Sequence, residues 1–358
     1  MAAKTYLAGD LGGTKTLLSI YRQIDGQLKK EHSYRYRSAE WQDLESILRH
    51  FLELAPAALP KPTTSCIAVA GPVHQGSAKI TNLPWQMSET SLSVATGLER
   101  LELVNDFAVI VHGLSHFSDE QQVVLQMGRN RSAPAPAGAE NRPVAILGAG
   151  TGLGMARGLP AAGGWLAMPS EGGHREFAPR TEEEWELAQW LKQDLGLPRL
   201  SIERIVSGPG LGHVMNWLLN RQTGIQHGLK AHAQAWRSMS ADQPGYPDLP
   251  SFTSKAAAEG DHLASKALKL WLGAYGSAAG DLALQELCHG GLWIGGGTAL
   301  KNLNGLCSKQ FLEPLRSKGR FRSLIEGLTI RAIIDPEAGL FSAACRAHDL
   351  EESGGTLA

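Results

Sequence analysis

Residues Leu7 to Tyr21 read LAGDLGGTKTLLSIY. An apolar run enters a turn that spans Gly9 to Thr14, and a second apolar run leaves it. β-Branched and aromatic residues on either side of a glycine cluster are typical of a strand–turn–strand unit. The adjacent glycines Gly12 and Gly13 allow the backbone to aim several N–H groups at one point, which suits a group of phosphate oxygens. From this stretch alone, an ordinary hairpin turn is the alternative.

Two polar side chains in this turn add to the phosphate interpretation. Asp10 supplies a carboxylate that can hold hydrated Mg²⁺, and Thr14 supplies a hydroxyl that can bond to an oxygen. A Walker A loop does not fit, because Thr14 stands where its second glycine is required. A dinucleotide fingerprint does not fit either, because residues 16–21 read as a strand and not as a helix. The turn resembles the first phosphate loop, D-x-G-G-T, of the sugar kinase, actin and heat-shock chaperone superfamily.

Composition narrows the class of protein. The 358 residues exceed a usual single domain of roughly 100–150, so two cores are expected. The net charge is −1 and the cations are scattered, so neither a nucleic-acid nor a membrane partner is expected. No stretch approaches ~20 apolar residues, and the first strand begins too early for a signal peptide, which favours a cytoplasmic location. The four cysteines lie far apart without C-x-x-C spacing, which argues against zinc and against a disulfide scaffold.

Apolar spacing predicts strands that alternate with helices, as in an α/β sheet with some parallel pairing. Helices are expected over residues 41–54, 88–96, 107–114, 182–195, 211–221, 266–287 and 336–348. Strands are expected over residues 31–36, 65–70, 101–104, 144–147, 202–206, 292–294 and 330–334, besides the opening pair. Residues 131–143 read as a mobile surface loop, and residues 222–251 as an insertion or an irregular region. The strand–turn–strand pattern recurs about 140 residues after its first occurrence, which suggests two related halves that face each other across a cleft.

Four glycine-rich turns are each expected to follow an apolar strand, and together they indicate a nucleotide clamp. They are Gly9–Thr14, Gly148–Gly154, Ser207–Gly210 and Gly295–Thr298. In the second turn, Gly150, Thr151 and Gly152 offer N–H groups and a hydroxyl to terminal phosphates. In the fourth, Gly296 and its neighbours would let an adenosine lie on bare backbone at a helix N-terminus. Close packing between strand and helix is the alternative for that fourth turn.

Asn105 and Asp106 end a predicted strand, where open α/β sheets place their ligand groups. A carboxylate there is ionised near neutral pH and can accept the proton of a hydroxyl that attacks a γ-phosphorus. Because phosphoryl transfer has a loose transition state, the larger task of such a base is to orient the hydroxyl in line. An Asx cap for the helix at Phe107 is an equally good explanation of this pair.

A second polar cluster reads Ser170-Glu-Gly-Gly-His174. A Glu-x-x-His pair on a helix would suggest a metal site, but two glycines make a helix improbable. In a turn, Glu171 and His174 can converge on vicinal hydroxyls of one small ligand. A Glu–His pair that only holds a loop is the alternative. Glu203 is a third candidate, although by itself it reads as a surface residue.

These motifs resemble, in order, those of the bacterial ATP-dependent glucokinases that lack a zinc motif, members of the hexokinase–actin superfamily. They are Asp10-Leu-Gly-Gly-Thr14, Ala70-Gly-Pro72, Asn82-Leu-Pro-Trp85, Asn105-Asp-Phe107, Gly148-Ala-Gly-Thr-Gly-Leu-Gly154, Glu171-Gly-Gly-His174, Glu203-Arg-Ile-Val-Ser-Gly-Pro-Gly210 and Gly295-Gly-Gly297. The second glycine motif and the Glu-Gly-Gly-His motif are together highly specific. The resemblance covers nearly the whole chain.

The resemblance implies a glucokinase that phosphorylates the 6-hydroxyl of D-glucose with Mg·ATP in the first step of glycolysis. By this resemblance Asp106 is the base, and the sugar hydroxyls are bound by Asn105, Asp106, Glu171, His174 and Glu203. Mg·ATP would be bound by Asp10, Gly12, Gly13, Thr14, Gly150, Thr151, Gly152 and Gly296, with Asp10 holding the metal through water. The implied fold is a two-lobed actin-like ATPase fold around a cleft: a small α/β domain of residues 1–116 plus 336–358, and a larger α+β domain of residues 117–335. Homodimers are usual in this family.

Several features depart from the family pattern or leave alternatives open. Lys15 stands where some relatives carry a neutral residue, and the family does not explain residues 131–143 or 222–251. A broader hexose kinase is the nearest alternative function. A non-catalytic sugar sensor would need a further binding segment, for which the early phosphate loop leaves no room at the N-terminus. An actin-like ATPase without a sugar substrate does not explain Glu171 and His174.

Overall fold

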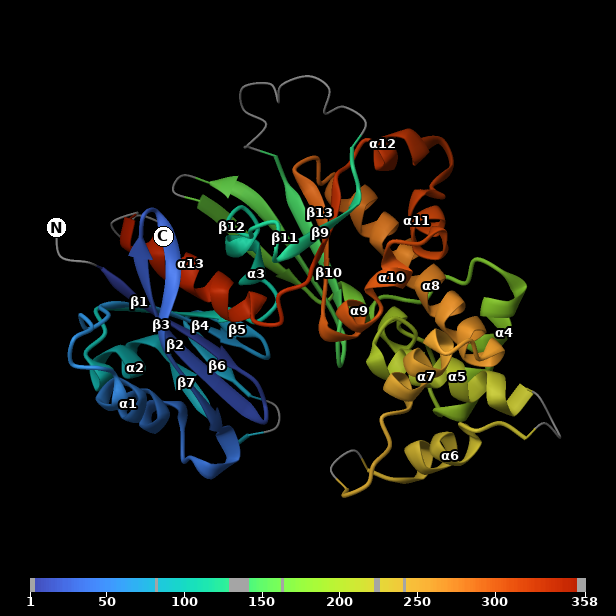
Figure 1. Ribbon diagram of the computed structural model, residues 1–358, viewed down its shortest axis with the longest axis horizontal. Coiled ribbons are helices and arrows are strands. Elements are labelled where there is room, and N and C mark those ends of the chain that lie inside the picture. The colour runs from blue at the N-terminus through green and yellow to red at the C-terminus, as the bar shows by residue number, and fades with distance from the viewer. Residues whose placement is uncertain are drawn as a thin grey trace. The chain divides into compact units, whose positions relative to one another are not determined.

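The computed structural model describes residues 4–80, 83–128, 142–161, 164–221, 226–240 and 243–352. Its contacts divide the chain into two compact units. The first unit comprises Met1–Gln121, Ala156–Pro169 and Asp335–Ala358, and the second comprises Gln122–Met155 and Ser170–Ile334. Figure 1 shows that both contain a sheet flanked by helices, so the expected mixed α/β class is confirmed. Among the residues described, no helix is both long and apolar enough to cross a membrane.

The first unit is built on a five-stranded sheet of order β3-β2-β1-β4-β8. Its strands are β1 (Thr5–Leu11), β2 (Lys15–Ile24), β3 (Gln27–Arg37), β4 (Thr64–Val69) and β8 (Arg100–Asn105). β1 and β2 form the expected antiparallel hairpin, whereas β4 pairs in parallel with both β1 and β8. The carboxyl ends of β1, β4 and β8 therefore meet at one edge, and Asp106 N donates to Val69 O at 2.9 Å there.

Alternation along these strands supplies a core on each face of this sheet. Leu7 and Leu11 face one core with α1 (Leu44–Leu54), whose N-terminus is capped by Asp43. Tyr6 and Ala8 face the other core with α13 (Ala338–Glu352), the red helix in Figure 1. The remaining elements of this unit are short. They are the strands β5 (Val73–His74), β6 (Ser77–Lys79) and β7 (Gln86–Ser88), the helices α2 (Glu89–Thr96) and α3 (Ile110–Gly113), and the 3₁₀ turn η1 (Ser38–Glu40).

The other large sheet has six strands in the order β12-β11-β10-β13-β14-β9. They are β9 (Gln122–Gln126), β10 (Val144–Ala149), β11 (Leu153–Ala161), β12 (Gly164–Ser170), β13 (Gly291–Gly295) and β14 (Ile330–Ile333). β10, β13 and β14 run parallel, and Gly148 is the register partner of Gly295. The parallel pairing therefore brings two of the predicted glycine turns to the same sheet edge.

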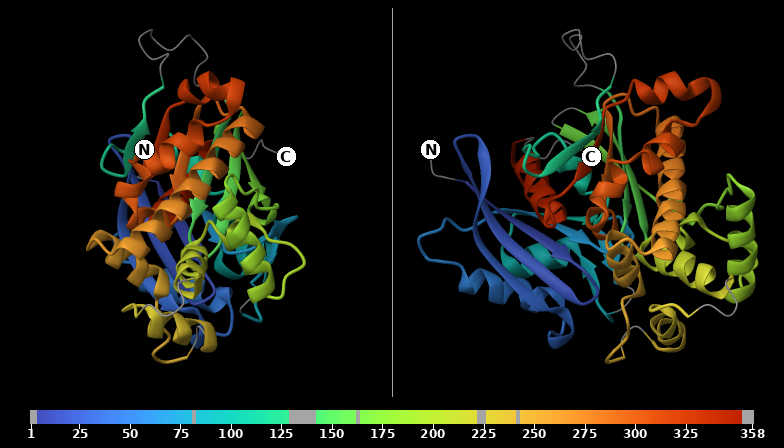
Figure 2. Two further views of the ribbon diagram at one scale, coloured as in Figure 1. Left: turned by 90° about the vertical axis from the view of Figure 1, so that its right-hand side faces the viewer. Right: turned by 45° about the vertical axis from the view of Figure 1, so that its right-hand side comes forward.

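Helices of the second unit pack against β10 and β13 of this sheet. The long α8 (His262–Glu286) is orange in Figure 2, and α5 (Gly208–Arg221), α7 (Leu249–Ala258) and α11 (Lys309–Arg316) pack against it. The other helices are α4 (Glu182–Asp194), α6 (Lys230–Ser238), α9 (Gly297–Lys301), α10 (Leu303–Leu306) and α12 (Arg322–Glu326). Three short 3₁₀ turns also lie in the described part of this unit: η2 (Gly172–His174), η3 (Ile202–Arg204) and η4 (Gly319–Phe321).

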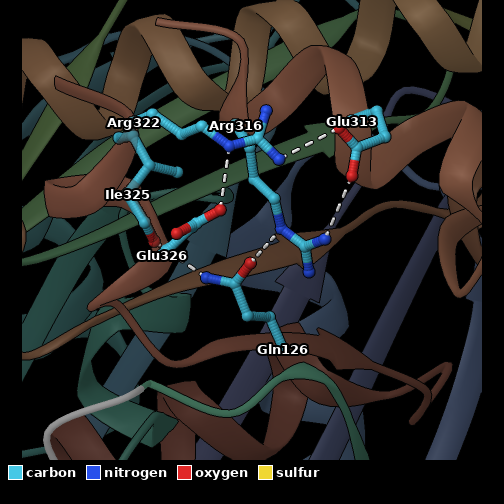
Figure 3. A network of polar contacts seen from close by, with 6 residues as sticks. All are labelled: Gln126, Glu313, Arg316, Arg322, Ile325 and Glu326. Atoms are coloured by element: carbon cyan, nitrogen blue, oxygen red, sulfur yellow. Dashed lines mark hydrogen bonds and ion pairs between the residues drawn. The ribbon is translucent and has the colours of Figure 1, made fainter. Parts of the chain in front are cut away.

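A polar network anchors the edge strand β9 to helices α11 and α12 (Figure 3). Buried Gln126 donates to the carbonyls of Ile325 and Leu328 at 2.8 and 2.9 Å, and accepts from Arg316 Nε at 2.6 Å. Glu313 accepts from Arg316 and from Arg322 at 3.4 and 3.1 Å. Because the side-chain polar groups of Gln126 are satisfied, this network adds to the apolar contacts that Leu125 of β9 makes with the core.

Some expectations about secondary structure were wrong. Residues 202–206 form η3 and not a strand, since the chain turns there to begin α5 at Gly208. By contrast, the turn expected at residues 171–174 is confirmed: Gly172–His174 form a single 3₁₀ turn, which two adjacent glycines permit. The described part of residues 222–251 is not irregular throughout: it contains α6 and the start of α7. The predicted loop 131–143 lies outside the described residues except for Arg142 and Pro143.

Candidate active site

The first glycine turn closes the β1–β2 hairpin. Gly12 N donates to Lys15 O at 2.9 Å, and the neighbouring η1 is tied to the turn by Ser38 N, which donates to Thr14 O at 3.1 Å. The turn opens onto a cavity of about 400 Å³. Its lining residues are Asp10, Gly12, Thr14, Lys15, Leu17, Arg35, Asp335, Pro336 and Glu337. Asp10 and Thr14, both predicted to bind Mg·ATP, thus lie in one cavity.

Asp10 is a carboxylate of this cavity whose surroundings oppose its ionisation. Burial, and then the nearby charge of Glu337, raise its pKa above the usual value near 3.8. A cation bound beside it would favour the ionised form and offset that desolvation cost. A carboxylate and the hydroxyl of Thr14 are oxygen donors of the kind that Mg²⁺ prefers, so these residues fit a hydrated magnesium ion.

Asp335 and Glu337 in the same cavity were missed by the sequence analysis. Asp335 accepts from Gln121 Nε2 at 2.6 Å and from Glu337 N at 2.8 Å, while Glu337 forms an ion pair with Lys30. The only signal in the sequence is Asp-Pro-Glu before a helix, which reads as a cap. Their position beside Asp10 depends on α13 packing against β1, which sequence spacing does not reveal.

Asn105 and Asp106 have different contacts at the end of β8. Asn105 Oδ1 accepts from Phe107 N at 3.1 Å and from Ala108 N at 3.0 Å, so Asn105 caps the turn that leads into α3, whose helical residues begin only at Ile110. Its amide nitrogen donates to Gly71 O at 3.1 Å and to Asp106 Oδ1 at 3.2 Å. The capping explanation therefore accounts for Asn105, and the Asp106 carboxylate is oriented by its neighbour.

The second and fourth glycine turns lie side by side in the second unit. Gly150 N donates to Gly152 O at 2.9 Å and Gly150 O accepts from Gly208 N at 2.7 Å, which fixes the turn after β10. Gly296 has φ 90°, and a Cβ on it would lie 2.3 Å from Ala149 O. Close packing thus requires glycine at 296, as the alternative interpretation of that turn held. It also leaves bare backbone at the start of α9.

Buried Tyr275 hydrogen-bonds to the backbone at the start of both turns, and no sequence motif indicates this role. Its hydroxyl accepts from Ala149 N at 3.2 Å and lies 3.1 Å from Gly295 O, where it can donate. One phenol on α8 thus joins the ends of β10 and β13. Burial raises the pKa of Tyr275, so the hydroxyl stays protonated as this role requires.

Glu171, His174 and Glu203 converge, as predicted for the first two. His174 Nε2 lies 3.6 Å from Glu171 Oε2, and His174 Nδ1 lies 4.0 Å from Glu203 Oε1. Glu171 is exposed, whereas Glu203 is partly buried and accepts from Leu153 N at 3.0 Å. A Cβ on Gly152 would lie 2.6 Å from Glu203 Oε2, so Glu203 contacts the second glycine turn directly. It is not an isolated surface residue.

The predicted site residues therefore form four groups, two in each unit. The first unit contains the Asp10 cavity and the Asn105–Asp106 pair. The second contains the paired glycine turns and the cluster of Glu171, His174 and Glu203. The paired turns also border a cavity of about 320 Å³ that is lined in addition by residues from 236–254, a region in which no sequence motif indicates a function.

Comparison with known proteins identifies the family. The Glucokinase family model matches residues 7–350. The chain is 36% identical over 341 residues to a glucokinase of Nostoc punctiforme, covering 94% of this chain and 97% of the relative. It is 36% identical over 351 residues to a glucokinase of Synechocystis sp., covering 95% and 96%. The crystal structure of glucokinase from an Antarctic psychrotroph superimposes with a TM-score of 0.79 at 28% identity and covers 97% of this chain and 99% of that one. The expected actin-like sugar-kinase fold is thereby confirmed, and the chain belongs to the glucokinase family.

Proposed function

We propose that this protein transfers the γ-phosphoryl group of ATP to the 6-hydroxyl of D-glucose, giving glucose 6-phosphate and ADP. The observation that carries the proposal is the Asn105–Asp106 pair in a chain of the glucokinase family. Asn105 caps the turn before α3, so Asp106 is not required for that role. A carboxylate at the end of a sheet strand, held by a neighbouring amide, suits a base that must orient a hydroxyl.

The proposed chemistry needs one proton acceptor. The 6-hydroxyl oxygen attacks the γ-phosphorus, its proton passes to the Asp106 carboxylate, and the bond from the γ-phosphorus to the β–γ bridging oxygen breaks to release ADP. Since the transition state is loose, Asp106 contributes mainly by holding the hydroxyl in line. The same residue and Asn105 would also bind the sugar.

Glu171, His174 and Glu203 are proposed to bind the other hydroxyls of the same sugar. Their mutual distances of 3.6 and 4.0 Å suit three groups that share one small polar ligand. Carboxylates accept from sugar hydroxyls and an imidazole can donate or accept. A site of this kind rejects analogues that lack a hydroxyl, because the partner group is left unpaired.

The nucleotide is proposed to bind the glycine turns. The groups that would contact Mg·ATP are those expected from the sequence: Asp10, Gly12, Gly13, Thr14, Gly150, Thr151, Gly152 and Gly296. Magnesium, held by Asp10 through water, would neutralise charge on the phosphates when bound. The cavity beside Asp10 and the bare backbone at Gly296 support this assignment.

Further parts of the proposal rest on the family alone. We propose a cytoplasmic enzyme of glycolysis that acts as a homodimer. The proposed domains remain residues 1–116 plus 336–358 and residues 117–335, and the division of contacts into two units supports a two-domain chain.

A coupled assay for glucose 6-phosphate with ATP, Mg²⁺ and a panel of hexoses tests the function. We expect turnover with glucose and much less with mannose, fructose or glucosamine. Similar kcat/KM values across the panel would indicate a broader hexose kinase. Glucose binding without turnover would indicate a sensor, and ATP hydrolysis that does not respond to sugar would indicate an actin-like ATPase.

A further inference from the structure

The cavity of about 320 Å³ in the second unit begins at the second glycine turn and extends away from it. One wall is Gly150 and Thr151, and a second is the region around Thr298. The full lining comprises Gly150, Thr151, Gly208, Pro209, Trp236, Tyr246, Asp248, Pro250, Ser251, Ser254, Thr298, Lys301 and Asn302. None of the residues proposed to bind sugar lines it, so the cavity continues from the phosphate-binding turn alone.

The lining contributed by residues 236–254 includes two aromatic side chains, and both are firmly held. Trp236 is only 9% exposed and packs on α5, where Gly212 leaves room for it: a Cβ there would lie 2.9 Å from the indole. The ring of His213 meets the indole edge-on at 5.1 Å. Tyr246 is half-buried and hydrogen-bonds to Trp236. Two aromatic side chains fixed in this way form a surface suited to a flat ring, with little ordering cost on binding.

The same part of the lining carries a carboxylate. Asp248 is exposed and caps α7, with Ser251 N donating to Oδ1 at 3.1 Å. A carboxylate has about four acceptor positions, so the cap leaves it able to accept from hydroxyl or amino groups of a ligand. The lining around Thr298 is also fixed, since Thr298 Oγ1 donates to Gly150 O at 3.4 Å and Asn302 Nδ2 donates to Thr298 O at 2.9 Å.

From this arrangement we infer that Trp236, Tyr246 and Asp248 determine the class of phosphoryl donor: they bind the nucleoside of a nucleoside triphosphate and so select it over a donor made only of phosphates. These three residues form the nucleoside wall. A volume at the low end of the roughly 300–1,000 Å³ of small-molecule sites suits one nucleoside. The inference rests on the proposed function, and it gives a role to a region that the family pattern left unexplained.

The test removes the carboxylate of Asp248 from the cavity but keeps a side chain that can cap α7. In Asp248→Ser the serine still caps α7 but no longer reaches into the cavity. Asp43→Ser is the matched control, because Asp43 caps α1 through Ser46 N at 2.8 Å and does not line the cavity. Affinity for ADP and for pyrophosphate is measured by calorimetry on the full chain, together with KM for ATP and for glucose.

We expect Asp248→Ser to weaken ADP binding and raise KM for ATP by about tenfold or more, as for a lost hydrogen bond to a charged group. Pyrophosphate affinity, KM for glucose and thermal stability should match those of Asp43→Ser. Tyr246→Phe, which keeps the ring, should cost less. Unchanged ADP affinity in Asp248→Ser, or an equal loss of pyrophosphate affinity, would contradict the inference that the nucleoside wall binds the nucleoside. A wild-type protein that binds ADP but never phosphorylates glucose would instead refute the proposed function alone.

Discussion

Asp106 is the residue on which the proposed chemistry depends. In Asp106→Ala the proton acceptor and the oriented carboxylate are lost together, whereas the cap supplied by Asn105 remains. We expect kcat to fall by roughly 10²–10⁴ while the protein stays folded. Steady-state kinetics and circular dichroism check this, with Asp119→Ala as the control because Asp119 is an exposed carboxylate in the same unit. If Asp106→Ala turned over near the wild-type rate, Asp106 would not be the base.

Asp10 is proposed to bind magnesium in its ionised form, but the ionised form also lowers the stability of the folded protein. Burial, and then Glu337, raise its pKa above 3.8, so the contribution of this group to stability is present below that value and is lost as pH rises through the folded pKa. At neutral pH the ionised carboxylate destabilises the folded state. We therefore expect Asp10→Asn to raise the melting temperature near pH 7 in the absence of nucleotide, with the gain shrinking toward pH 4. A variant that melts below wild type at pH 7 contradicts this.

At the scale of one element, the turn between β13 and α9 is expected to tolerate a side chain at position 297 but not at position 296. Gly296 has positive φ and no room for a Cβ, whereas a Cβ on Gly297 would meet nothing within 4 Å. Gly296→Ala should therefore shift the backbone that meets Ala149, raise KM for ATP and lower the melting temperature. Gly297→Ala is the matched control, and it should be neutral or slightly stabilising because alanine favours the helix. Equal effects in the two variants would show that the turn is not under steric constraint.

Local patterns predicted most elements but not the contacts between distant ones. The β1–β2 hairpin follows from the glycine turn between two apolar runs, and the helix α1 follows from apolar spacing of period 3.6; both signals are local. The helix α6 was missed because its stretch is polar, and the burial of Trp236 depends on contacts with other elements, such as Gly212 on α5. The turn at Glu171 was foreseen, but its contact with Glu203 depends on a separate segment.

The molecule as a whole contains longer-range contacts that a single sequence does not reveal. α13 completes the first unit: Arg346 on it pairs with Glu102 of β8, and Glu351 accepts from Thr64 of β4 at 2.6 Å. These partners are separated by 244 and 287 residues. The expectation that the last helix joins the N-terminal strands came from the family resemblance, because no periodicity encodes such a pairing. The same packing explains why Asp335 and Glu337 were not foreseen.

Each unit also holds one buried, neutral histidine. His112 lies in the first unit and is 3% exposed; burial, and then the charge of Arg346, lower its pKa to about 3. His213 lies in the second unit and is 6% exposed; burial, and then Arg237 and Arg204, lower its pKa to about 4. A depressed folded pKa gives stability that is present above the ordinary value of 6.5 and is lost as pH falls below it, because only the unfolded chain then takes up the proton.

Acidification should therefore destabilise both units, by at most about 1.4 kcal/mol per pH unit for each histidine. Urea unfolding at pH 7.5 and pH 5.5, followed by a probe in each unit, measures the effect. We expect His112→Asn to reduce the acid sensitivity of the first unit and His213→Asn that of the second. His262→Asn, at an exposed position, should leave both transitions as in wild type. If the loss of stability at pH 5.5 persisted in the double variant His112→Asn/His213→Asn, other groups would have to be responsible for it. If each single substitution acted equally on both transitions, the two units would unfold as one cooperative body.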